Sequence, residues 1–98
     1  MKVRRISCLL LLLCSGCRSP SPENGVLLFH DHCLVCHTVA PGSQRNALSL
    51  AGYFRRNPAP DPGRTRQLIR NGRGLMQPFR DRLSNAQIDD VIAYLKTR

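Results

Sequence analysis

The sequence predicts one small all-α domain of three to four helices, and three observations lead to this prediction. The chain has 98 residues, a length that allows a single domain. No segment alternates polar and apolar residues convincingly, as a half-buried strand would. Three segments instead begin with residues that favour a helix start, and the last of them carries apolar residues at helical spacing.

The first sixteen residues, 1–16, have the three parts of a secretory signal peptide. A basic start, an apolar run and an exit of small residues occupy residues 2–5, 6–13 and 14–17. The apolar stretch covers about a dozen residues, whereas a membrane span needs roughly 20. The sequence therefore predicts an exported, periplasmic protein whose leader is not a permanent transmembrane helix.

Cys17 follows Ser15-Gly16 at the end of a leucine-rich run, which resembles the lipobox of bacterial lipoproteins. In those proteins the cysteine becomes the mature N-terminus and carries acyl chains, so the resemblance implies a lipid at Cys17 and anchoring to a membrane. One position differs, because Cys14 stands where leucine is usual. The alternative is ordinary signal-peptide cleavage near the same bond, which would leave one odd, exposed thiol in an oxidising compartment.

Residues 17–24 are expected to form a short tether, and residues 25–98 the folded domain. The tether is polar and contains two prolines. Ser21 and Pro22 also favour the start of the first helix, with serine as the N-cap and proline at the first helical position. We expect that helix to continue as far as Cys33.

The middle of the chain predicts a long loop followed by a short helix. Residues 38–57 have no clear period, and we expect a loop there with a helical turn near residues 48–52. After a proline-rich break, Asp61 and Pro62 favour a second helix with aspartate as its N-cap. The helix is expected to end at Asn71-Gly72 and to be followed by another loop.

The last helix has the clearest sequence pattern. Ser84 and Gln87 have the spacing of a capping box, in which each side chain bonds the backbone of the other residue. Four apolar residues follow at positions i, i+3, i+4 and i+7 and form one stripe; they are Ile88, Val91, Ile92 and Leu95. We expect this stripe to face the core together with Phe79 and Leu83.

The segment Cys33-Leu34-Val35-Cys36-His37 has the spacing of c-type haem attachment. On a helical turn, positions i, i+3 and i+4 share one face, so both sulfurs can reach the two vinyl edges of one haem while the imidazole points at its iron. The motif predicts one haem c, bound covalently at Cys33 and Cys36, with His37 as an axial ligand. A haem would also supply apolar surface to a domain too small to bury a large core.

Three other roles for these cysteines fit the sequence less well than haem attachment but stay open. A redox dithiol of thioredoxin type needs a fold with a sheet and a longer chain. A zinc site would need two of His30, His32 and His37, whereas structural zinc sites usually draw their second ligand pair from a distant segment. A structural disulfide would leave His37 without a role.

Met76 is the expected second axial ligand. It is the only methionine after the leader and lies in a glycine-rich loop, 39 residues after His37. A thioether on the far side of the iron raises the reduction potential relative to two imidazoles. A lone methionine otherwise most often fills gaps in a core.

Residues 25–98 resemble the small bacterial class I cytochrome c family, whose members bind one haem through histidine and methionine. Gly25 and Phe29 lie eight and four residues before Cys33, as in the first helix of that family. There the glycine lets an aromatic residue of the last helix approach closely, and Tyr94 fits that partner. The distal loop and C-terminal helix of the family have counterparts here too. The resemblance implies a small cytochrome c fold around a covalently attached haem.

Two positions depart from the family pattern. Gln77 follows Met76 where the family often has proline, and Leu48 stands where proline is often found ahead of a Leu-x-Gly turn. In the family, the backbone carbonyl at the second position accepts the ring N–H of the ligand histidine. Every residue has that carbonyl, so Leu48 can still accept a hydrogen bond from His37.

Other residues near these motifs have two possible roles. His30 and His32 lie just before the attachment site, and we expect surface or packing roles for them. Tyr53, Phe54 and the pair Arg55-Arg56 either line the haem and hold a propionate or pack within the loop and face solvent.

The basic surplus persists after the leader. From Arg18 onward, eleven arginines and one lysine stand against six carboxylates, a net charge of +6 before any propionate is counted. Such a surface favours redox partners with acidic docking surfaces, or an anionic membrane face. Nucleic acid also binds arginine-rich chains, but export argues against such a partner.

The sequence thus predicts a single-electron carrier in a periplasmic or membrane-associated redox chain. An iron with six ligands has no open position for substrate chemistry, so the protein is not expected to be an enzyme by itself. One alternative is a haem c subunit of a dehydrogenase or oxidase complex. Another is a gas-binding or peroxidase haem protein in which Met76 is off the iron.

Overall fold

The computed structural model describes residues 18–43 and 47–98. In these residues the chain forms three α-helices and one short 3-10 helix and contains no strand, which confirms the all-α class. The elements in chain order are α1 (Pro22–His32), η1 (Tyr53–Arg55), α2 (Pro62–Asn71) and α3 (Asn85–Leu95). The helical turn expected near residues 48–52 is displaced to η1. The backbone just before η1 forms a hydrogen bond to a distant segment instead: the N–H of Leu50 donates to the carbonyl of Thr38 at 2.8 Å.

Each α-helix begins at the capping residue that the sequence predicts. The side chains of Ser21, Asp61 and Ser84 each accept a hydrogen bond from the backbone N–H three residues further on. In the last case the side chain of Gln87 also accepts from the N–H of Ser84, so the capping box is complete. These bonds satisfy N–H groups that have no partner within the helix, and therefore fix where each helix starts.

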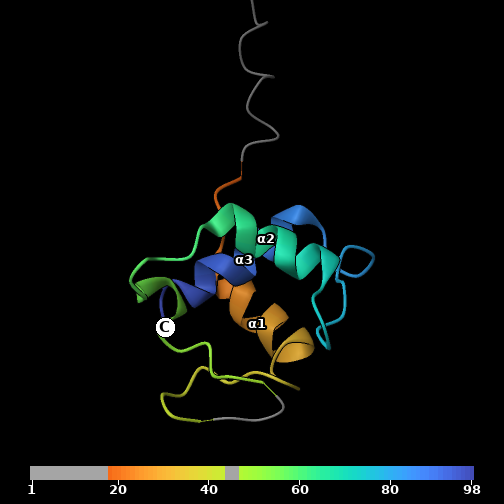
Figure 1. Cartoon of the computed structure of the whole chain (residues 1–98). Coiled ribbons are helices and arrows are strands. Elements are labelled where there is room, and N and C mark those ends of the chain that lie inside the picture. Colours follow the sequence, from red (N-terminus) through yellow and green to blue (C-terminus); the bar gives the residue numbers. More distant parts are fainter. Residues whose placement is uncertain (1–17, 44–46) are drawn as a thin grey trace, which may run out of the picture.

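Helix α3 contacts both α1 and α2 (Figure 1), and its contact with α1 depends on Gly25. A Cβ atom at this position would overlap the carbonyl oxygen of Asp90 and lie 2.7 Å from the Cβ of Tyr94. Only glycine allows this approach. The ring centroids of Phe29 and Tyr94 lie 5.5 Å apart at an interplanar angle of 58°, a favourable tilted arrangement. The expected pairing of Gly25 with Tyr94 is confirmed.

The core consists of two clusters of buried side chains, and α3 contributes to both. Leu28 and Phe54 are partly buried and pack against both clusters. The buried members are Ile69, Phe79, Leu83, Ile88 and Ile92 in the first cluster and Phe29, Val91, Tyr94 and Leu95 in the second. The core residues expected from the sequence are therefore buried.

The segment that precedes α1 is bound to α3. Asp90 is buried in the middle of α3, and its side chain accepts hydrogen bonds from the guanidinium of Arg18 at 2.9 Å and from the N–H of Ser21 at 2.8 Å. In Figure 1 this segment, in orange, reaches the helices from the side on which α2 lies. Because α1 begins at Pro22, the helix includes the last three residues of the segment expected to be a tether.

Among the described residues, no helix has the length and hydrophobicity needed to span a bilayer. The expected signal peptide and Cys17 lie outside the described residues, and their roles stay predictions.

Candidate functional site

The segment Cys33–His37 continues α1 as a hydrogen-bonded turn. The N–H of Cys33 donates to the carbonyl of Phe29 at 2.8 Å. The N–H groups of Cys36 and His37 both donate to the carbonyl of Cys33, at 3.1 and 2.8 Å. As expected for positions i, i+3 and i+4, the two thiols and the imidazole line one cavity.

That cavity, here called the central cavity, has a volume of about 200 Å³. Met76, from the loop after α2, lies in its wall, so the four residues expected to bind haem meet there. The other lining residues are Val35, Ala47, Leu75 and Phe79, which are apolar, and His32, Gln77 and Arg82, which are polar.

His37 is oriented by a backbone acceptor. Its Nδ1 lies 2.9 Å from the carbonyl oxygen of Leu48. Because a carbonyl only accepts, Nδ1 carries the proton and Nε2 keeps a lone pair that can bind a metal. The hydrogen bond expected between His37 and Leu48 is confirmed.

Met76 is positioned by a tight turn at the end of α2. Arg73 and Met76 exchange two backbone hydrogen bonds, each 3.0 Å long. Gly72 has a φ of +72°, and a Cβ there would lie 2.5 Å from the carbonyl oxygen of Met76. The chain can fold back this closely only at glycine. The side chain of Met76 is half-buried and packs against the core cluster that α2 and α3 share.

The surroundings of the two cysteines disfavour the other roles considered for them. Burial, and after it the neighbouring Cys36, raises the pKa of the Cys33 thiol to about 11, whereas a nucleophilic redox thiol needs a lowered pKa. Cys33 and Cys36 are both free thiols, so no disulfide joins them. Within residues 18–43 and 47–98, no three His, Cys, Asp or Glu side chains gather as a metal site.

The donor groups of the central cavity fit haem c. Two thiols can form the thioether bonds, and an imidazole and a thioether are the ligands that iron has in many c-type cytochromes. These groups come from two separate segments, the turn after α1 and the loop after α2, and apolar side chains line the same cavity. The chemistry of the residues present therefore matches the cofactor that the sequence predicts.

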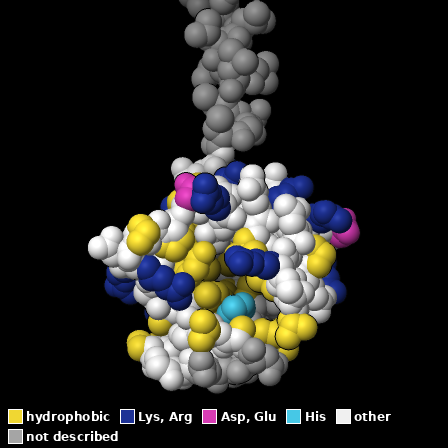
Figure 2. Space-filling view, viewed as in Figure 1, with side chains coloured by type: hydrophobic (Ala, Val, Ile, Leu, Met, Phe, Trp, Pro, Cys, Tyr) yellow, Lys and Arg dark blue, Asp and Glu magenta, His cyan; other side chains and the backbone are white. Residues whose placement is uncertain are grey.

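The central cavity has an apolar margin with a positive charge beside it. The side chains of Val35 and Leu75 both line the cavity, yet Val35 is 68% exposed and Leu75 is fully exposed. Arg82 also lines the cavity, and its guanidinium carbon lies 5.9 Å from the centre of the Phe79 ring. Figure 2 shows a face of the molecule on which hydrophobic side chains gather around a histidine, with lysine and arginine side chains about them.

The two histidines that precede the motif have the surface and packing roles expected for them. His30 is exposed. His32 is half-buried and meets the ring of Phe79 edge-on, with 6.1 Å between centroids. Its place in the wall of the central cavity is therefore one of packing.

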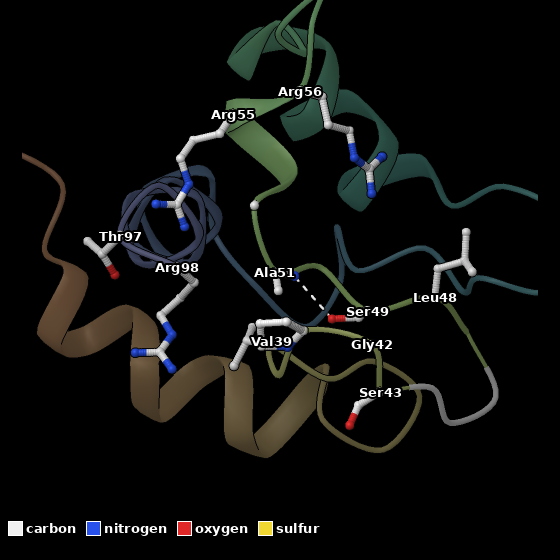
Figure 3. Close-up of a pocket in the computed structure, with 12 residues that line it drawn as sticks. Val39, Gly42, Ser43, Leu48, Ser49, Ala51, Arg55, Arg56, Thr97 and Arg98 are labelled. Carbon is white, nitrogen blue, oxygen red and sulfur yellow. Dashed lines mark hydrogen bonds between the residues drawn. The ribbon is translucent and has the colours of Figure 1, made fainter.

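The arginine pair after η1 lies at a second, larger cavity. Arg55 and Arg56 line a space of about 740 Å³ with Arg98 and Leu48 (Figure 3), and neither lines the central cavity. Tyr53 and Phe54 are engaged elsewhere: the hydroxyl of Tyr53 lies 3.2 Å from that of Thr65, and Phe54 packs on the core. Packing within the loop and on the core therefore describes Tyr53 and Phe54, whereas a contact of Arg55 and Arg56 with a haem propionate stays a prediction.

Sequence reasoning assigned no role at the central cavity to several residues that line it, among them Val35, Leu75 and Arg82. Val35 and Leu75 carry a positional signal, because one lies inside the attachment motif and the other precedes Met76. Arg82 carries none, since it reaches the cavity only through the path of the loop between α2 and α3.

Comparisons with known proteins found one matching family and similar solved structures. The family described as cytochrome c oxidase, cbb3-type, subunit III matches residues 20–95. No curated protein sequence matches the chain. Among solved structures, cytochrome c6 from the diatom Phaeodactylum tricornutum is similar with a TM-score of 0.59 and 20% identity, covering 79% of this chain and 92% of that chain. This likeness supports the fold.

Proposed function

The chain belongs to the cytochrome c oxidase, cbb3-type, subunit III family, and from that membership we propose that Cys33 and Cys36 bind its haem and that His37 and Met76 hold the iron. The protein is a monohaem c-type cytochrome with one covalent haem c. Its role is single-electron transfer, which is not an enzymatic activity of the chain by itself.

The meeting of four side chains from two separate segments in one cavity carries the assignment of these residues. Leu48 occupies Nδ1 of His37, which leaves Nε2 for the iron. Met76 brings a soft thioether from the opposite segment, a ligand that favours the reduced state. Cys33 and Cys36 are free thiols within the same turn and are available for covalent attachment.

When bound, the haem supplies a one-electron couple between ferrous and ferric iron. His37 and Met76 together leave no position open for a substrate, and the apolar wall limits the access of water. Val35 and Leu75 offer an apolar contact at the margin, and Arg82 adds a positive charge. We therefore propose redox partners that dock there weakly through acidic surfaces.

A second candidate function is that of a haem subunit in an oxidase or dehydrogenase complex. The description of the matching family favours it, because that description names an oxidase subunit. Both functions use the same haem site and differ in whether the protein associates permanently. A free carrier is expected to elute alone on gel filtration after mild solubilisation, whereas a subunit elutes with its enzyme.

We also propose that the protein is exported to the periplasm and acylated at Cys17. The support is the sequence of the leader, with its basic start, its apolar run and the small residues before Cys17. A lipid there would keep the electron carrier at the membrane surface.

The test is a denaturing mass measurement and an absorption spectrum of protein matured in a host that attaches haem and processes lipoproteins. We expect the mass of the chain from Cys17 onward plus one haem and the acyl groups. We also expect the weak near-infrared band of ferric iron–methionine ligation and no ready binding of carbon monoxide. Colourless protein at the bare polypeptide mass would contradict the haem proposal. Immediate carbon monoxide binding would contradict the role of Met76.

A further inference from the structure

We infer that Asp90 holds residues 18–21, here called the entry segment, against α3, so that the acylated protein keeps its haem cavity turned away from the bilayer. The inference rests on the proposed lipid at Cys17, which directly precedes the entry segment. It adds an orientation on the membrane and a class of partner to the proposed function.

The first support is the environment of Asp90. Its side chain is 2% exposed, whereas the side chain of its ion-pair partner Arg18 is 53% exposed. In the described part of the chain, both hydrogen bonds to this carboxylate come from the entry segment, one from Arg18 and one from the N–H of Ser21. A buried carboxylate without partners is strongly unfavourable, so the fold itself favours the bound position of the entry segment.

The second support is that residues next to this carboxylate also join α1 to α3. The N–H of Gly25 donates to the carbonyl of Ser21 at 3.0 Å, and Gly25 packs directly on the backbone of Asp90. The entry segment and the first turn of α1 are thus held on α3 by adjoining contacts. A lipid on the residue before Arg18 would be about one Cα–Cα step, roughly 3.8 Å, from this held segment.

The third support is the position of the central cavity relative to the entry segment. Helix α1 has 11 residues, which at 1.5 Å per residue separates its ends by about 16 Å. Ser21 caps its first turn, and Cys33 follows its last. Figure 1 shows the entry segment arriving on the side of α2, whereas α1 points its C-terminal end to the opposite side of the molecule.

The side from which the entry segment arrives also carries positive charge. Arg64 is exposed and Arg70 half-buried on α2, and within the described residues neither forms an ion pair. Such arginines attract the anionic headgroups of a membrane surface. These charges add to the attachment of the entry segment, from which we infer that the α2 side faces the bilayer and the central cavity faces the water.

The orientation selects the class of redox partner. Electrons reach or leave the haem on the side away from the lipid, so the partner is a water-exposed protein domain with an acidic surface. A carrier dissolved in the bilayer would have to approach through the α2 side, where the central cavity has no wall residues.

The experiment uses the acylated, haem-containing protein bound to phosphatidylcholine vesicles that contain a small fraction of headgroup-labelled fluorescent lipid. Energy transfer to the haem quenches the label and falls steeply with distance. We expect weak quenching by the wild-type protein and at least twofold stronger quenching by Asp90→Asn, because the released domain can turn its haem toward the bilayer. Asp81→Asn, an equal charge change at an exposed residue, should match the wild type.

Arg18→Gln is the second variant and keeps the experiment decisive if Asp90→Asn does not fold, since Arg18 lies at the surface. It should also strengthen quenching, and Arg80→Gln, at another exposed arginine, should not. Equal quenching by the wild type and Arg18→Gln, with the acyl mass present on both, would overturn this inference and leave the lipid proposal intact. Protein that lacks the acyl mass would overturn the lipid proposal, and with it the orientation.

Discussion

His37 and Met76 depend on different kinds of support within the same cavity. His37 is oriented by one hydrogen bond to a backbone carbonyl. Met76 is carried by a turn whose closeness requires glycine at position 72. A substitution at either ligand removes a contact to the metal, whereas a substitution at Gly72 moves the backbone of a ligand.

Replacing Met76 with alanine removes the thioether and leaves both cysteines in place. We expect Met76→Ala to retain its haem, to bind carbon monoxide readily when reduced, and to have a lower reduction potential. The decrease should be a measurable part of the roughly 0.8 V range that axial ligands cover. Redox titration and carbon monoxide spectra give these quantities. Leu27→Ala, at an exposed residue of α1 outside the central cavity, should keep the wild-type potential. Loss of the haem from Met76→Ala would show that our division of roles is wrong.

Gly25→Ala tests the close contact between α1 and α3. The added Cβ meets the backbone of Asp90 and the Cβ of Tyr94, and neither can move unless a helix shifts. We expect the free energy of unfolding of the haem-containing protein, measured by chemical denaturation, to fall by about 3 kcal/mol or more.

Gly63→Ala is the matched control for this substitution. Its Cβ would meet only the end of the Asp61 side chain, at 3.1 Å, so the free energy of unfolding should change by less than about 1 kcal/mol. Equal losses in the two variants would mean that the Gly25 contact has no special importance.

Among the elements, the three helices could be predicted because their signals are local. Ser21, Asp61 and Ser84 lie three residues from the N–H groups that they cap, so a short window of sequence contains the whole signal. The attachment motif is local for the same reason. Local patterns were therefore enough to predict the helix starts, the turn after α1 and the core face of α3.

The features that sequence reasoning missed depend on contacts between distant segments. The sequence leaves two roles open for Arg55 and Arg56, and it does not show that they follow a turn in which the N–H of Gly52 donates to the carbonyl of Arg98. Asp90 and the adjacent Asp89 differ in their distant partners, because Asp90 binds Arg18, 72 positions away, whereas Asp89 pairs with Arg66, 23 positions away. No period or spacing along the chain carries such information.

Gly72→Ala tests the loop that carries Met76. A Cβ there would lie 2.5 Å from the carbonyl oxygen of Met76 and 2.8 Å from the nitrogen of Pro78, so the loop must move. We expect the near-infrared band of ferric iron–methionine ligation to weaken or disappear while the haem stays attached. Gly74 also has a positive φ, of +58°, but its Cβ would meet nothing within 4 Å. Gly74→Ala is thus expected to keep the band, and the same loss in both variants would point to backbone strain alone.

The molecule as a whole has a positive net charge. One of its arginines, Arg82, lies in the wall of the central cavity. A positive charge near the exposed margin of the haem site speeds the approach of an anionic reagent at low salt. We expect Arg82→Glu to slow oxidation by hexacyanoferrate(III) several-fold at low ionic strength. The difference should shrink as added salt screens the charges.

Arg64→Glu is the control, because it makes the same charge change on α2, outside the central cavity. Stopped-flow rates for both variants across a salt series separate a local effect from one of net charge. If the two variants slow the reaction equally, net charge alone controls the approach.

The hydrogen bond between His37 and Leu48 affects how distant relatives of this chain can be found. The side chain of Leu48 is 63% exposed and takes no part in that bond, so position 48 tolerates many residues as long as the path of the backbone is kept. A search pattern that demands proline there would pass over this chain. A pattern that specifies only the separation of 11 positions from the ligand histidine would retain it.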